Sequence, residues 1–360
     1  MSDVELRGVT KVFPDGHGGQ TEVLKGVDIV APSGQFVVLL GPSGCGKSTS
    51  LRIIAGLESA TSGDVLIGGE RVNDVPAAKR KIAMVFQNYA LYPHLTVLEN
   101  IVFGLRVRKV PKRERLEKAH RAAETVGLTD YLQRKPAQLS GGQRQRAALA
   151  RALVSDARVV LMDEPLSNLD AKLRQQMRIE LRALQQELGL TVIYVTHDQV
   201  EAMTMADHVV VMRKGEVAQA AAPVDLYTDP ADTEVASFIG SPPMNLLPAR
   251  PVDGGLEVSG AVGTWPVPSG DRPVVVGVRP EALSVDGAGS LRLAGVVDST
   301  EILGAETLVT LHAADGQSLV ARLPGIVRLD KGSPVQLTTD PSHLRFFDAE
   351  TGRALAVSHA

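Results

Sequence analysis

The chain has 360 residues, enough for two or three domains, and 44% of them are hydrophobic, so a sizeable core can be buried. A formal net charge of -3 argues against a general nucleic-acid binder, and the single cysteine excludes an intrachain disulfide, which is compatible with a reducing cytosol. The sequence shows neither a secretory signal pattern nor an apolar run near the ~18 residues of a spanning helix, so we expect any membrane role to be peripheral or through a partner.

Strand and helix patterns alternate from the start of the chain to about residue 240. Apolar or alternating runs predict strands at 4–13, 27–30, 36–40, 65–67, 82–86, 159–162 and 192–195. Helices are predicted from 51 to a stop at Gly56, from Pro111, over 144–153, and over an amphipathic stretch that ends at Gly189. Farther on, short valine-rich runs separated by Gly, Pro, Asp and Ser predict a small barrel-like β domain.

These patterns give a domain organisation. We expect an α/β core over residues 1–88 and 149–240, a helical subdomain inserted at 89–148, and a β-rich domain over 241–360.

A glycine-rich loop follows the strand at 36–40 and precedes the helix that stops at Gly56. It fits the pattern G-x-x-x-x-G-K-[ST] and consists of Gly41, Pro42, Ser43, Gly44, Cys45, Gly46, Lys47, Ser48 and Thr49. Strand, loop and helix in this order predict a phosphate-binding loop, because curled backbone N–H groups and a helix N-terminus both attract phosphate oxygens. Lys47 is expected to reach the β and γ phosphates of a nucleotide triphosphate, and Ser48 to bind Mg²⁺.

Two adjacent carboxylates, Asp163 and Glu164, end the strand at 159–162. Strand alternation points them in different directions, so one can face the Mg²⁺ held by Ser48 and the other an attacking water. We assign Asp163 to Mg²⁺ and Glu164 to orienting or deprotonating the water of a phosphoryl transfer.

A second anion site is predicted at the start of the helix at 144–153. Its residues are Ser140, a good N-cap, then Gly141, Gly142 and Gln143. One chain cannot easily bring both anion sites to the same phosphate if they lie on different subdomains. A second copy of the chain could supply the second of the two sites. An ordinary capped helix after a turn is the alternative.

Two further residues stand at strand ends. Gln87 could sense the γ phosphate or Mg²⁺ and pass movement to the helical subdomain, and His197 could contact the γ phosphate. Taken alone, each is more simply a satisfied polar residue.

Together these motifs resemble the ATPase subunit of ATP-binding cassette (ABC) transporters. The resemblance rests, in chain order, on GPSGCGKST, Gln87, LSGGQRQR, VVLMDEP, the stretch Ser167, Asn168, Leu169 and Asp170, and the stretch Thr196, His197 and Asp198. The sequence is most similar to the sugar-importer branch, of the maltose/maltodextrin or glycerol-3-phosphate type, through residues 84–94, 164–174, 238–242 and 277–281.

The resemblance implies a site and its partners. ATP would lie between two subunits of a homodimer, with the loop of one facing residues 140–143 of the other, Phe13 stacked on adenine, Asp170 in the subunit contact and His197 on the γ phosphate. Residues 87–94 would receive two transmembrane permease subunits, on the cytoplasmic side of the cell membrane, in a complex that includes an extracytoplasmic solute-binding protein. The β-rich domain would be an OB-like regulatory domain.

Two alternatives remain at this point. An importer ATPase for another solute, such as a polyamine or a metal ion, shares the core motifs. A soluble cassette ATPase acting on ribosomes or DNA is disfavoured, because the chain has one phosphate loop, one LSGGQ and an acidic balance. The cassette would not contact the solute, so its sequence does not name it.

Overall fold

The computed structural model describes residues 3–15, 19–265, 272–285, 287 and 289–355. The chain forms two compact units, one up to Pro223 and one from Val224 onward. The domain limits predicted at 88/89, 148/149 and 240/241 stay predictions.

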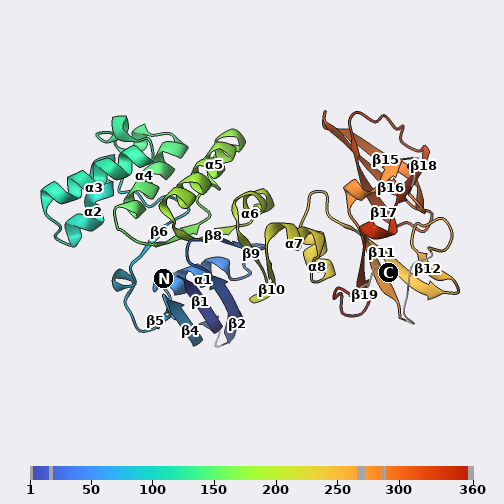
Figure 1. The fold of residues 1–360 in the computed structure, drawn as a ribbon, viewed down its shortest axis with the longest axis horizontal. Coiled ribbons are helices and arrows are strands. Elements are labelled where there is room, and N and C mark those ends of the chain that lie inside the picture. The colour runs from blue at the N-terminus through green and yellow to red at the C-terminus, as the bar shows by residue number, and fades with distance from the viewer. Residues whose placement is uncertain (1–2, 16–18, 266–271, 286, 288, 356–360) are drawn as a thin grey trace. The chain divides into compact units, whose positions relative to one another are not determined.

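A six-stranded sheet forms the centre of the first unit (Figure 1). Its strand order is β10 (Glu216–Ala221), β9 (His208–Arg213), β3 (Phe36–Leu40), β8 (Thr191–Thr196), β7 (Val159–Asp163) and β6 (Ile82–Val85). All neighbours are parallel except the edge strand β10, which runs antiparallel to β9. Every residue of β3, β7 and β8 is buried, because both faces of the sheet are covered.

A four-stranded antiparallel sheet lies beneath this centre in Figure 1. Its order is β2 (Gln20–Ala31), β1 (Val4–Pro14), β4 (Ser62–Ile67) and β5 (Glu70–Arg71). Helix α1 (Lys47–Ala55) packs with both sheets in one apolar cluster that includes Val4, Leu24, Leu39 and Ile54.

Helices cover the opposite face of the six-stranded sheet (Figure 1). Those over the sheet are α5 (Ala171–Leu188) and α6 (Gln199–Met205), whereas α2 (Val97–Val107), α3 (Lys112–Thr125) and α4 (Gly141–Leu153) pack on one another beside β6. The predicted ends of α1 and α5 are confirmed, since Gly56 and Gly189 cap them in the left-handed conformation. Pro111 is the N-cap residue of α3 rather than its first residue, because α3 begins at Lys112. No helix among the described residues is long and apolar enough to cross a membrane.

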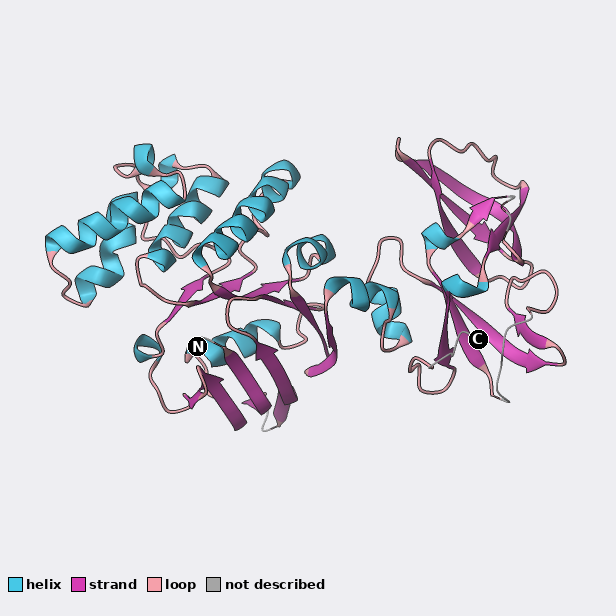
Figure 2. Ribbon diagram, in the orientation of Figure 1, coloured by secondary structure: helices cyan, strands magenta, loops and turns pink. Residues whose placement is uncertain are grey.

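Short helix α7 (Pro223–Thr228) starts at the boundary between the units. The second unit continues with short helix α8 (Thr233–Phe238) and is otherwise β-rich, as predicted (Figure 2). One sheet has the order β12 (Gly255–Val258), β11 (Asn245–Val252), β13 (Val274–Val278) and β19 (Leu344–Asp348). The other has the order β14 (Ser284–Val285), β18 (Pro334–Thr339), β15 (Leu291–Ile302), β16 (Glu306–His312) and β17 (Ser318–Pro324). Side chains from both sheets surround the buried Trp265 in one core.

Candidate nucleotide site

The polar residues predicted from sequence gather where parallel strands end. Strands β3, β8, β7 and β6 are neighbours, and their carboxyl ends lead to the glycine loop, His197, Glu164 and Gln87 respectively. Ligands of open α/β sheets bind at this edge, because the loops that follow the strands meet there. The sheet order therefore brings together residues that lie far apart in the sequence.

The glycine loop is shaped by positions that exclude a side chain. Gly46 has a φ of +106°, and a Cβ there would lie 2.5 Å from Cδ2 of Leu24. A Cβ on Gly41 would lie 2.2 Å from the carbonyl oxygen of Met212. Contacts this close leave room only for glycine, so neighbouring strands hold the loop against the start of α1.

Lys47 fills the inside of the curled loop. Its Nζ donates to the carbonyl oxygens of Gly41, at 2.7 Å, and Pro42, at 2.8 Å, and the residue is 5% exposed. The far end of α1 is fixed by Arg80, whose guanidinium donates to the carbonyl oxygens of Ile53 and Ile54. The helix that presents Lys47 is thus anchored at both ends.

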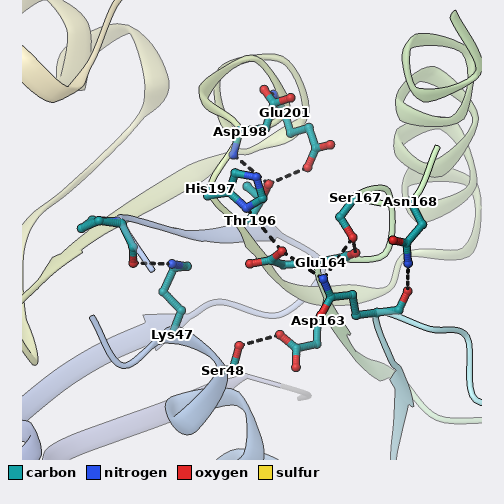
Figure 3. A network of polar contacts seen from close by, with 12 residues as sticks. Lys47, Ser48, Asp163, Glu164, Ser167, Asn168, Thr196, His197, Asp198 and Glu201 are labelled. Carbon is teal, nitrogen blue, oxygen red and sulfur yellow. Dashed lines mark hydrogen bonds and ion pairs between the residues drawn. The ribbon is translucent and has the colours of Figure 1, made fainter. Parts of the chain in front are cut away.

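Ser48 and Asp163 form the pair expected to bind Mg²⁺. The Ser48 hydroxyl donates to Oδ1 of Asp163 at 2.8 Å, across 115 residues of sequence (Figure 3). A hydroxyl and a carboxylate are hard oxygen donors, and Mg²⁺ is typically held by few protein oxygens together with phosphate oxygens and water. The residues present therefore fit the metal, although its ligands stay a prediction.

Glu164 faces a different set of partners from Asp163. Its Oε2 lies 3.3 Å from Nδ1 of His197 and 3.5 Å from Nε2 of Gln87 (Figure 3). The predicted divergence of the two carboxylates is thus confirmed. Glu164 has a φ of 43°, a left-handed conformation that costs a non-glycine residue roughly 1–2 kcal/mol and is concentrated at functional sites.

Gln87 is tied to the turn after Glu164. Its Nε2 donates to Oγ of Ser167 at 3.3 Å, and Nδ2 of Asn168 donates to its carbonyl oxygen at 3.1 Å. The Ser167 hydroxyl in turn donates to the carbonyl oxygen of Glu164. Hydrogen bonds therefore join the segment that enters the helical subdomain to the turn that carries Glu164.

Residues 140–143, predicted as a second anion site, form the capped N-terminus of α4. Ser140 and Gln143 form a capping box, with each side chain accepting from the backbone N–H of the other. A Cβ on Gly141 would lie 2.8 Å from Cδ2 of Leu169, which immediately precedes Asp170. Besides baring backbone N–H groups, Gly141 thus lets the helix N-terminus approach the turn at Leu169 closely.

Two expected contact residues make other contacts within the chain. The Asp170 carboxylate is the N-cap of α5 and accepts from the backbone N–H of Leu173 at 2.9 Å. Phe13 lies on β1, with the Lys11 ammonium 4.6 Å from its ring centroid. These contacts orient both side chains, while their roles toward a nucleotide or a second subunit stay predictions.

The sequence did not predict a role for the polar residues that flank the turn at His197. Thr196 and Glu201 are buried, and Arg174 donates to the carbonyl oxygen of Leu169 and contacts Asp198. The spacing of Thr196 and Glu201 is visible in the sequence, but their burial depends on packing between α6 and the sheet.

A lysine enclosed by a glycine loop, on a largely parallel sheet with a helical insertion, is typical of phosphate-loop nucleoside triphosphatases. A family model for ABC transporters matches residues 24–167, and models for the MalK OB fold domain and the TOBE domain match residues 240–283 and 276–347. A solved dimeric ATP-binding cassette bound to ADP and Pi superposes with a TM-score of 0.56 at 36% identity, covering 61% of this chain and 98% of that chain.

Relatives match over nearly the whole length. The sn-glycerol-3-phosphate import ATP-binding protein UgpC of Cereibacter sphaeroides is 50% identical, covering 99% of this chain and 100% of its own. A putative ATP-binding protein of Brucella abortus is 48% identical, covering 99% and 100%. The chain belongs to the ATP-binding subunits of ABC transporters, with a MalK-type OB and TOBE region, and it is an ATPase.

Proposed function

We propose that the chain powers the import of sn-glycerol-3-phosphate or a related carbohydrate solute by hydrolysing ATP. The observation that carries the hydrolytic assignment is the Glu164 carboxylate, held 3.3 Å from His197 beside the Ser48–Asp163 pair. The solute class is supported by relatives named for sn-glycerol-3-phosphate import, which this chain matches over 99% of its length at 50% and 48% identity.

Each residue of the site has a separate role in binding and hydrolysing ATP. The backbone of residues 41–49 and the Lys47 ammonium hold the phosphates, and Phe13 stacks on adenine. Glu164 orients the attacking water and takes its proton on the carboxylate, while His197, oriented through Nδ1, holds the γ phosphate.

Mg²⁺ completes this site in our proposal. Ser48, Asp163 and Gln87 would hold the metal, which would supply positive charge beside the phosphate oxygens. The 2.8 Å contact between the first two side chains supports a shared ligand position.

Two copies of the chain build the complete site. Ser140, Gly141, Gly142 and Gln143 of one copy meet the phosphates bound by the loop of the other, and Asp170 contributes to the subunit contact. The similar ATP-binding cassette with ADP and Pi is dimeric, which supports this arrangement. ATP then bridges the two subunits, and hydrolysis removes the bridge.

Permeases dock near residues 87–94 in this proposal. Side chains from two helices hold the backbone of that segment: Arg151 donates to the carbonyl oxygens of Tyr89 and Ala90, and Asn100 donates to that of Tyr92. The Tyr92 side chain is 39% exposed and contacts Phe103, so it offers an aromatic surface that is already ordered. The subunit would lie on the cytoplasmic side of the inner membrane, in a complex with two permeases and an extracytoplasmic solute-binding protein, without nucleic acid.

Replacing the proposed base tests the hydrolytic role. Glu164→Gln keeps the shape of the side chain but cannot take a proton, so phosphate release should stop while an ATP-bound dimer accumulates, as measured by light scattering with and without ATP. Glu117→Gln is the matched control, because its side chain is 52% exposed on α3. Sustained turnover by Glu164→Gln would remove Glu164 from this role.

The solute is tested on the assembled transporter. ATP hydrolysis should rise with sn-glycerol-3-phosphate and the solute-binding protein, and not with a polyamine or a metal ion. Stimulation by either of the latter alone would overturn the solute class and leave the ATPase assignment intact.

A further inference from the structure

Glu201, on α6, is a buried acid that the proposed mechanism does not use. It is 3% exposed, and burial raises the pKa of its carboxyl. Removing a carboxylate from water is unfavourable unless hydrogen bonds compensate. Here both donors reach the same oxygen: Tyr194 donates to Oε2 at 2.8 Å. Thr196 donates to it at 2.7 Å (Figure 3).

The Thr196 hydroxyl connects this acid to the turn that carries His197. A hydroxyl has one hydrogen, so donation to Glu201 directs its lone pairs elsewhere. One of them accepts from the backbone N–H of Asp198 at 3.0 Å. Residues 196 and 198, on either side of His197, are therefore joined by a hydroxyl whose direction Glu201 sets.

The other side of the turn is also fixed. The Asp198 carboxylate caps α6 by accepting from the N–H groups of Val200 and Glu201, and its second oxygen lies 3.5 Å from the Arg174 guanidinium. His197 itself has little support from packing, because its side chain is 58% exposed and its polar contact is with Glu164. The position of its ring must come from the backbone of the turn.

We propose that Glu201 is a positioning residue for His197 and acts through the Thr196 hydroxyl. The inference rests on the proposed role of His197 toward the γ phosphate. Tyr194 serves as a comparison, because its hydroxyl donates to the same Glu201 oxygen. Within the described part of the chain, the Tyr194 hydroxyl has no hydrogen bond to the turn at residues 196–198, whereas the Thr196 hydroxyl has one.

The test compares variants that remove one hydroxyl each. Thr196→Val keeps the shape of the side chain and should lower the kcat of ATP hydrolysis about ten-fold, or about 1.4 kcal/mol in the barrier, with the KM for ATP within about two-fold. Thr196→Ser should restore most of the kcat. Tyr194→Phe, the matched control, should keep its kcat even if its unfolding midpoint falls.

The outcomes separate a positioning role from a structural one. Equal kcat losses in Thr196→Val and Tyr194→Phe, or a wild-type kcat in Thr196→Val, would overturn the inference. Thr196→Ala repeats the measurement with a smaller side chain if Thr196→Val folds poorly. Glu201→Leu, which has no acceptor oxygen, should lower the kcat as Thr196→Val does, whereas Glu201→Gln, which keeps one, should retain most of the kcat; equal kcat values in the two Glu201 variants would overturn the role of Glu201. His197→Ala tests the underlying function separately: undiminished turnover there refutes the role of His197, whereas loss there with normal Thr196→Val refutes the positioning role alone.

Discussion

Arg279 offers a sharp test of how the second unit is held together. It is 8% exposed, and its guanidinium donates to the carbonyl oxygens of Ala236, at 3.2 Å, Ile239, at 2.5 Å, and Tyr227, at 2.6 Å. The guanidinium also lies 3.9 Å from the centroid of the Tyr227 ring. One side chain thus joins helices α7 and α8 to the strand end that precedes it.

The expected effect of Arg279→Met follows from these contacts. The acceptors lie at the ends of helices, where carbonyl oxygens lack donors within the helix. Each orphaned buried acceptor costs about 1–3 kcal/mol. The cation–π contact adds about 1 kcal/mol, while release of a buried charge offsets part of the loss. We therefore expect Arg279→Met to lower the free energy of unfolding of the second unit by about 4 kcal/mol.

Tryptophan fluorescence during denaturant unfolding reports this unit directly, because the chain has one tryptophan and Trp265 is 1% exposed in its core. Arg250→Met is the matched control, since the Arg250 side chain is 72% exposed and pairs with an exposed glutamate, so a change under about 1 kcal/mol is expected. A loss below about 1 kcal/mol in Arg279→Met would refute the reasoning about orphaned carbonyls.

Two further predictions concern the first unit. Gly46→Ala places a Cβ 2.5 Å from Leu24 at a φ of +106°, so it should abolish ATP binding measured by calorimetry. Gly34→Ala is the control outside the loop: with a φ of +78° and no atom within 4 Å of the new Cβ, it should cost about 1–2 kcal/mol of stability and keep ATP binding, and equal ATP affinities in the two variants would contradict this account. Glu201→Gln should gain stability relative to wild type as pH rises. Burial raises the pKa of Glu201 in the folded state, so the folded chain binds more protons at this site than the unfolded chain does. The stability of the wild type therefore falls as pH rises from about 4.3 through the raised pKa, and that of Glu201→Gln lacks this fall. The free energy of unfolding is measured from about pH 4 to about pH 8 for both proteins. A constant difference between Glu201→Gln and wild type over this range would contradict a raised pKa for Glu201 in the folded state.

Features that depend on neighbouring residues were predictable from sequence. The glycine loop, the caps Gly56 and Gly189 of α1 and α5, and the N-cap Ser140 all follow from short patterns, because a glycine conformation or a capping hydrogen bond involves only a few adjacent residues. Strand alternation also predicted that Asp163 and Glu164 have different partners, as they do. The reason differs, because β7 ends at Asp163 and the left-handed backbone of Glu164, with a φ of 43°, sets the direction of its side chain.

Only the tertiary structure shows which distant residues contact these local motifs and hold them in place. The sequence identified the stretch around Arg279 only as a resemblance, because its partners are 40 to 52 residues away. The sequence also did not distinguish the buried Glu201 from a solvent-exposed glutamate, because its burial results from the packing of α6 against the sheet. Strand order, which brings the ends of β3, β8, β7 and β6 to one edge, is set by contacts between distant segments, and the site exists only because of that order.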